Sequence, residues 1–260
     1  MSQNQISEKL QMRISGPVHE VATDLNWLPK SGFLQESKGM SRHLKQDLEE
    51  AYHRLLELSG QVEEMISNAI RSLASRDTAM ANEVIAQDAE IDRVEVRIEE
   101  ECLKMLALHQ PVAADLRRVT TMMKINNDLE HIADLTCNVA ERANDLVNSP
   151  AFPIPELLTK MAQEATSMVR ESLNAFVNLD IESAYNVIQS DDSVDSMNVD
   201  VISQLHSVMK ENVEWVPPAV SCFSASRSLE QIADHAVNVA EDVIYMVNGV
   251  IVRHRHGQAE

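Results

Sequence analysis

Glycine and aromatic residues are scarce in this sequence. Only six of its 260 residues are Gly, and Phe, Tyr and Trp together make up 3%. Leu, Met, Ala, Val and Ile are plentiful instead. Because few residues favour turns and many favour helices, the composition excludes a turn-rich fold and predicts long helices.

Basic charge and long apolar runs are also lacking. The chain has 22 Lys and Arg against 41 Asp and Glu, a formal net charge of −19. This charge argues against nucleic acid and anionic membrane surfaces as direct partners, and favours metal cations and basic protein surfaces. The longest apolar stretch, residues 243–252, is too short to span a bilayer, and residues 1–10 have no apolar core of a signal peptide. We therefore expect a cytoplasmic protein without membrane insertion.

The chain also lacks the motifs that usually mark catalysis. It has no Gly-rich phosphate loop, no nucleophile elbow and no Ser-His-Asp signature, so the sequence predicts a protein that is not an enzyme. Cys102, Cys137 and Cys222 show no C-x-x-C spacing and indicate buried thiols in a reducing compartment. Cys137 falls near the acidic positions described below, which leaves a soft metal ligand as the alternative.

Proline and glycine positions divide the chain into three parts. Residues 1–40 contain scattered Pro and Gly and predict a flexible N-terminal arm. Helical periodicity begins after Ser41, a plausible N-cap, and "NSPAFPIPE" then places three prolines within six residues. The sequence thus predicts two helical units, residues 41–148 and 155–250, each with three long helices joined by short connections.

The two predicted units are copies of one pattern. "LEHIADLTCNVAER" (129–142) and "LEQIADHAVNVAED" (229–242) share nine of fourteen residues. "VIAQDAEID" (84–92) similarly matches "VIQSDDSVD" (187–195), and the capping residue Asp77 matches Asp180. The predicted fold class is therefore all-α, with two tandem, internally repeated three-helix bundles.

Each unit carries two acidic stripes. On the third helix of the first unit, Glu130, Asp134, Asn138 and Glu141 share one face, while Ile132, Leu135, Val139 and Ala143 are expected to point into the bundle. The second unit repeats this stripe at Glu230, Asp234, Asn238 and Glu241. On the second helices the pairs are Asp88 with Asp92, extended by Glu95 and Glu99, and Asp191 with Asp195, extended by Asn198.

These stripes raise a choice between a metal site and a solvated face. Like charges at i,i+4 repel by a few tenths of a kcal/mol, and a cation between two such helices removes the penalty. All-oxygen sites suit Mg, Mn, Ca or iron. A di-iron oxidase needs two E-x-x-H motifs in a bundle core, whereas this chain has one, Glu50 to His53, outside the stripes. His131 and His235 flank the stripes as solvent-facing residues or accessory ligands.

With the repeat established, the chain resembles the PhoU family of phosphate-transport regulators. "DLEHIAD" and "SLEQIAD" are similar to the family's twice-written E-R-I-G-D motif, and "HQPVAADLR" (109–117) and "SASRSLE" (224–230) are similar to the segments before it. The resemblance covers about residues 41–250 and implies a pair of three-helix bundles. It departs at the motif's Arg, which is His131 and Gln231 here, and at its Gly, which is Ala133 and Ala233.

The resemblance also implies a metal site in each unit. The family carries E/D-x-x-x-D motifs on two helices of each bundle, where iron or zinc clusters bind, and manganese or magnesium are further candidates. The metal-site residues implied here are Asp88, Asp92, Glu130, Asp134, Asp191, Asp195, Glu230 and Asp234.

The function implied by the resemblance is signalling. Such proteins link the ATPase of the high-affinity phosphate ABC transporter to a sensor histidine kinase, repress the phosphate-starvation response and restrain uptake. The resemblance also suggests a homodimer. Three alternatives remain open: an accessory protein of a low-affinity phosphate carrier, a metal-dependent enzyme or metal store, and a plain helical scaffold with empty acidic faces.

Overall fold

The computed structural model describes residues 41–149 and 152–252, and the predicted arm at residues 1–40 lies outside them. In the described ranges the chain is helical and has no strand. The helices are α2 (Arg42–Ser75), α3 (Thr78–His109), α4 (Ala113–Leu146), α5 (Glu156–Asn178), α6 (Ile181–Glu211), the short 3-10 helix η4 (Val213–Trp215) and α7 (Val216–Asn248). The predicted all-α fold of two three-helix units is confirmed.

Local sequence explains where these helices begin and end. Ser41 caps α2 by accepting a hydrogen bond from the Leu44 amide, and Asp77 and Asp180 cap α3 and α6 in the same way. Such side-chain acceptors satisfy amides that have no partner in the first helical turn. Gly249 ends α7 in the left-handed region at φ 70°, a conformation that costs Gly little because it has no Cβ.

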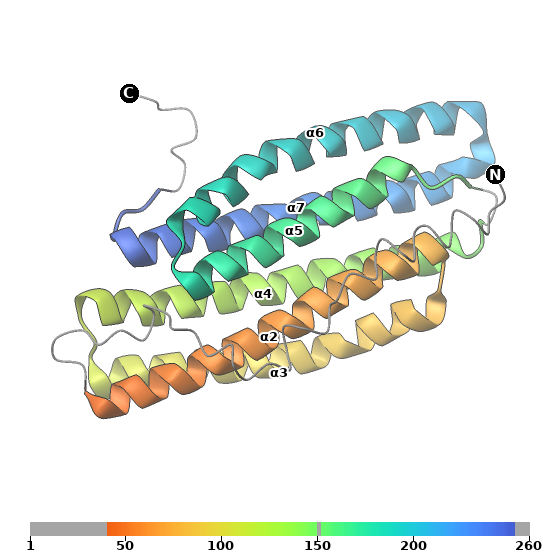
Figure 1. Cartoon of the computed structure of the whole chain (residues 1–260). Helices are drawn as coiled ribbons and strands as arrows, with labels where there is room; N and C mark the ends of the chain where they lie inside the picture. The colour runs from red at the N-terminus through yellow and green to blue at the C-terminus, as the bar shows by residue number, and fades with distance from the viewer. Residues whose placement is uncertain (1–40, 150–151, 253–260) are drawn as a thin grey trace, which may run out of the picture.

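The helices form two groups that meet along α4 and α7 (Figure 1). In the first unit α4 packs against α2 and α3, and in the second α7 packs against α5 and α6. Helices α4 and α7 also contact one another, and α2 touches α5. The third helix of each unit is therefore shared between its own bundle and the contact between the units.

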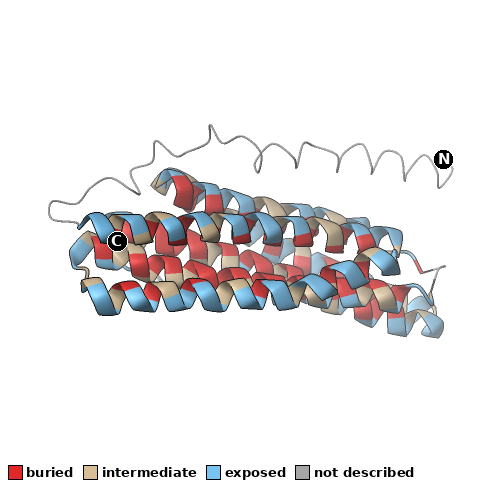
Figure 2. Cartoon of the chain, turned by 90° about the horizontal axis from the view of Figure 1, so that it is seen from below, coloured by how far each residue is buried: buried red, intermediate tan, exposed pale blue. Residues whose placement is uncertain are grey.

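The hydrophobic core runs through both units. Figure 2 shows buried residues on the inward sides of the helices and exposed residues on the outside. The buried side chains form one cluster that draws on every α-helix of the described ranges. Tyr52 of α2 and Phe176 of α5 are fully buried, with ring centroids 5.5 Å apart, so aromatic packing joins the two units.

Helices α4 and α7 run antiparallel and are held together by polar contacts as well. The contacts are Arg117 Nε to the Met246 carbonyl (3.2 Å), Lys124 Nζ to Asp242 Oδ1 (2.8 Å) and Ser221 Oγ to Asp145 Oδ2 (3.1 Å). Asp242 is 1% exposed. A buried carboxylate is costly unless it is paired, so its contact with Lys124 fixes the register between the units.

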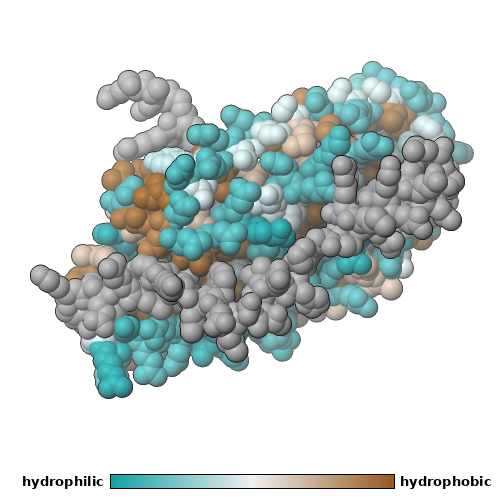
Figure 3. All heavy atoms as spheres, viewed as in Figure 1, coloured by the Kyte–Doolittle hydropathy of each residue, from teal (hydrophilic) through white to brown (hydrophobic). Residues whose placement is uncertain are grey.

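The outer surface is predominantly polar on the side that Figure 3 presents, where hydrophilic side chains surround smaller hydrophobic areas. None of the described helices is both long enough and apolar enough to cross a membrane.

Candidate functional site

The first group of predicted site residues comes together between α3 and α4. Asp88 and Asp92 lie four residues apart on α3, and Glu130 and Asp134 lie four apart on α4. Burial raises the pKa of Asp88, and the charges of Asp134, Asp92 and Glu130 raise it further. The four carboxylates, named here the first quartet, are therefore close enough to repel one another.

Cys137 lies beside the first quartet. Its thiol is 3.6 Å from Asp88 Oδ1, and burial together with the Asp88 charge raises the pKa of the thiol to about 12. Cys102 and Cys222 are fully buried, as the sequence predicts, whereas Cys137 is only half-buried; burial also raises the pKa of Cys102 and of Cys222 to about 12. A thiol with such a pKa is protonated at neutral pH, and a metal bound to Cys137 would favour its deprotonation.

The second quartet lies between α6 and α7 and consists of Asp191, Asp195, Glu230 and Asp234. The pKa of Asp191 is raised to about 6. Burial is the largest cause, and the negative charges of Asp234 and Asp195 raise the pKa further. Burial also raises the pKa of Glu230 and of Asp234. Like the first quartet, this group combines partial burial with mutual repulsion.

Two oxygens of the second quartet lack a protein partner. Asp191 Oδ1 and Glu230 Oε2 are buried and accept no hydrogen bond in the structure, although Glu230 Oε1 accepts one from Arg227 Nη1 at 2.8 Å. A buried oxygen without a donor costs free energy that a bound cation would recover. The donor set of both quartets, carboxylates with one thiol, thus fits a divalent or trivalent metal ion.

The quartets are not preformed cages. Among the described residues, no three Asp, Glu, His or Cys side chains already surround a common point that a metal ion would occupy. In each quartet the first Asp and the Glu are half-buried, whereas Asp92, Asp134, Asp195 and Asp234 are exposed. The exposed carboxylates have the rotamer freedom to move toward a cation, so the predicted metal sites remain a prediction that the geometry accommodates.

The structure corrects three details of the predicted stripes. Leu135, expected in the core, packs against the core cluster but is only half-buried, and it also lines the groove described below. Asn198 does not extend an exposed stripe: it is buried and accepts a hydrogen bond from Ser226 Oγ at 2.6 Å. Glu141 is exposed and pairs with Arg142, but its counterpart Glu241 is 6% exposed. In each case the burial of the side chain depends on the neighbouring helix, which the spacing of residues along one helix does not reveal.

A polar contact inside each unit repeats with the fold. In the first unit Asn126 Nδ2 donates to Glu95 Oε1 at 2.9 Å, joining α4 to α3. Ser226 and Asn198 join α7 to α6 at the corresponding positions. Burial raises the pKa of Glu95, and the charges of Glu99 and Glu130 add to this effect. Glu95 therefore belongs to the same acidic region as the first quartet and is held by Asn126.

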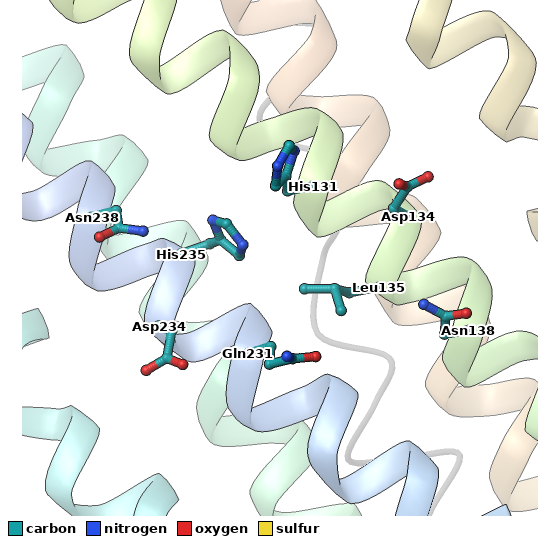
Figure 4. Close-up of a pocket in the computed structure, with 8 residues that line it drawn as sticks. All are labelled: His131, Asp134, Leu135, Asn138, Gln231, Asp234, His235 and Asn238. Carbon is teal, nitrogen blue, oxygen red and sulfur yellow. The ribbon is translucent and has the colours of Figure 1, made fainter.

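A groove between α4 and α7 was not predicted from the sequence. Its volume is about 440 Å³. The lining residues occupy four equivalent positions of the two units: His131 and Gln231, Asp134 and Asp234, Leu135 and His235, Asn138 and Asn238. In Figure 4 the two histidines project into the space between the helices, whereas the Asp134 and Asp234 carboxylates lie on the sides of their helices away from the histidines. The repeat shows in the sequence that these positions are equivalent in the two units. That they line one groove follows only from the antiparallel pairing of α4 with α7, which the sequence does not show.

The structure thus defines a class of protein: an all-helical chain of two repeated three-helix units, each with a carboxylate quartet. A family model described as the PhoU domain matches residues 55–143 and again residues 158–243. The chain therefore belongs to the PhoU family.

Individual proteins agree with this assignment. The "phosphate-specific transport system accessory protein PhoU homolog" of Pseudomonas putida is 35% identical over 83% of this chain and 84% of its own length. The crystal structure of PhoU from Pseudomonas aeruginosa matches with a TM-score of 0.77 and 35% identity over 79% of this chain and 99% of that one. The crystal structure of the phosphate transport system regulatory protein PhoU from Streptococcus pneumoniae matches with a TM-score of 0.75 and 29% identity. This match covers 80% of this chain and 99% of that one.

Proposed function

We propose that this protein is a metal-binding accessory protein of a high-affinity phosphate ABC transporter. In this proposal it links the transporter ATPase to a sensor histidine kinase, represses the phosphate regulon and restrains phosphate uptake. The observation that carries the proposal is the match of both units to the PhoU domain, together with relatives whose names place them in the phosphate-specific transport system.

The metal part of the proposal rests on the two quartets. Each combines half-buried carboxylates, raised pKa values and mutual repulsion, and the second has two buried oxygens without a partner. A metal ion would neutralise these charges and tie the second helix of each unit to the third. Iron or zinc is the proposed ion by family resemblance, with manganese and magnesium as candidates.

The adaptor part needs binding surfaces rather than a catalytic step. The chain carries a net charge of −19, and much of the surface in Figure 3 is hydrophilic. Basic surfaces on the ATPase and the kinase would be attracted to the acidic helix faces, with an association rate that falls as salt rises. A cytoplasmic location and a homodimer belong to the same proposal.

Binding assays with purified partners test the adaptor role. The full chain, the transporter ATPase and the cytoplasmic part of the kinase would be mixed pairwise at low and high phosphate. We expect measurable binding to both partners and a change in at least one affinity with phosphate. Absence of binding to either partner in both conditions would contradict the proposal.

Deletion of the gene separates this function from its main alternative. We expect the deletion strain to express phosphate-starvation genes in phosphate-rich medium, and the intact chain to restore repression. Loss of transport only through a low-affinity carrier, with normal repression, would instead support an accessory role for that carrier. Metal-dependent redox or hydrolytic turnover by the purified chain would support an enzyme.

A further inference from the structure

The groove between α4 and α7 contains a pair of histidines, one from each unit. The ring centroids of His131 and His235 are 5.3 Å apart, and the ring planes are inclined at 69°. Both rings project into the space between the two helices (Figure 4). The histidines occupy different positions of the repeat, because the counterpart of His131 is Gln231 and that of His235 is Leu135. The pair is therefore a feature of the seam between the units: neither histidine belongs to a quartet, although His131 contacts Glu130 of the first quartet.

Each histidine has one ring nitrogen engaged by a carboxylate. His131 Nδ1 contacts Glu130 Oε2, and His235 Nδ1 is 2.8 Å from Asp128 Oδ1. Asp128 is 7% exposed, and its Oδ1 also accepts a hydrogen bond from Asn238 Nδ2 at 3.5 Å. When Nδ1–H donates to a carboxylate, Nε2 carries the lone pair and is the nitrogen that binds a metal. This carboxylate–histidine arrangement is the usual support of metal-binding histidines.

The spacing of the rings fits a shared ion. Zinc binds imidazole nitrogen at about 2.0–2.1 Å in tetrahedral geometry, which places the centroids of two ligating rings roughly 5 Å apart. The observed 5.3 Å agrees with that separation. The centroid separation is therefore compatible with one ion bound by both rings.

The surroundings favour a cation over an anion. Asp134 and Asp234 also line the groove, the Asn138 and Asn238 amides add oxygen atoms, and the lining contains no Lys or Arg. In the described part of the chain, no third His, Cys, Asp or Glu is placed to complete a metal site with the two rings. The remaining coordination positions are therefore open to water or to an amide oxygen.

We propose that His131 and His235 bind one divalent cation of the zinc class through their Nε2 atoms and so bridge the two units across the groove. Imidazole suits Zn²⁺, Ni²⁺ and Cu²⁺, and two nitrogen ligands distinguish this site from the carboxylate quartets. The site goes beyond the proposed function, because it is formed by residues that the two units do not share.

Copper binding provides the test, because nitrogen ligands leave a signature in the electron paramagnetic resonance spectrum of Cu²⁺ that carboxylates do not. The protein would be the full chain without a tag, with His254 and His256 changed to Ala so that these two histidines do not bind copper. The variants are His131→Gln, which introduces the residue type of Gln231, and His235→Gln, whose amide can still donate to Asp128. His206→Gln, an exposed change on α6, is the matched control.

We expect coupling to two nitrogens at less than one equivalent of Cu²⁺. The apparent affinity of this site for Cu²⁺ should fall at least tenfold in His131→Gln and in His235→Gln. It should stay within twofold of the wild-type value in His206→Gln. A variant with Asp191→Asn and Asp195→Asn should keep the two-nitrogen signal, which separates this site from the second quartet. A spectrum with one nitrogen or none, or an unchanged affinity in His131→Gln, would overturn the proposal.

Discussion

The carboxyl group of Asp191 shows how a single residue links burial to metal binding. Burial raises its pKa to about 6 from an ordinary value of 3.8, and Asp234 and Asp195 add repulsion. The folded protein thus holds a proton on this group more tightly than the unfolded chain does. Stability is therefore lost as pH rises from about 4 to about 6, and the charged group remains a penalty at neutral pH.

Neutralising this residue should stabilise the metal-free protein. In the presence of chelator at pH 7.5, we expect Asp191→Asn to raise the free energy of unfolding by about 1 kcal/mol, since solvent screens a half-buried charge. The gain should largely disappear near pH 3.5, where the Asp191 carboxyl is mostly protonated in both the folded and the unfolded state. Urea unfolding at the two pH values measures it, with the exposed Asp200→Asn as control. A variant less stable than wild type at pH 7.5 would contradict this account.

Sequence reasoning predicted which carboxylates group together but not how each side chain is buried. The i,i+4 spacing and the repeat were enough to bring the residues of each quartet to adjoining helices. Leu135 is less buried than predicted and Asn198 more buried, because their exposure depends on where α7 lies against α4 and against α6. Asp128 was missed as a buried carboxylate, since its partner His235 comes from the other unit.

At the scale of the helices, the sequence predicted most of the fold. The cap residues Ser41, Asp77 and Asp180 are confirmed, and the predicted ends near Val147, Leu179 and Gly249 lie within one residue of the observed ones. Caps and prolines act locally, so these signals are readable without tertiary contacts. The short helix η4 was not predicted, and α7 begins at Val216 with prolines in its first turn.

The cap of α6 is expected to contribute measurably to stability. Asp180 Oδ1 accepts from the Glu182 and Ser183 amides at 3.0 and 3.2 Å, and the hydrogen bonds from Ser183 hold the pKa of Asp180 below its ordinary value. We expect Asp180→Ala to lower the free energy of unfolding by about 1 kcal/mol at pH 7. Because the pKa is lowered, this contribution should be lost as the pH falls below about 4.

The matched variant for this prediction is Asp180→Asn, which keeps a side-chain oxygen at the cap. It should cost much less than Asp180→Ala in the same urea unfolding experiment. Equal losses for the two variants would show that the cap hydrogen bonds do not carry the effect.

At the scale of the whole molecule, the two units are similar in their outer sites and different along the seam. Each unit places a quartet between its second and third helices, as expected of a repeat. Along the seam, Lys124 pairs with buried Asp242, and His131 faces His235, although neither contact has an identical counterpart in the repeat. The repeated sites suit a shared metal chemistry, whereas the seam fixes how the units are arranged.

The most direct test of this account is the metal content of the full chain, purified without chelator and without a histidine tag. Elemental analysis would compare wild type with a variant in which Glu130 and Glu230 become Gln and Asp134 and Asp234 become Asn. We predict several iron or zinc ions per chain in wild type, with the variant keeping at most the ion held by His131 and His235. Wild type without bound metal, together with a variant of equal or greater stability, would contradict the assignment of the quartets as metal sites.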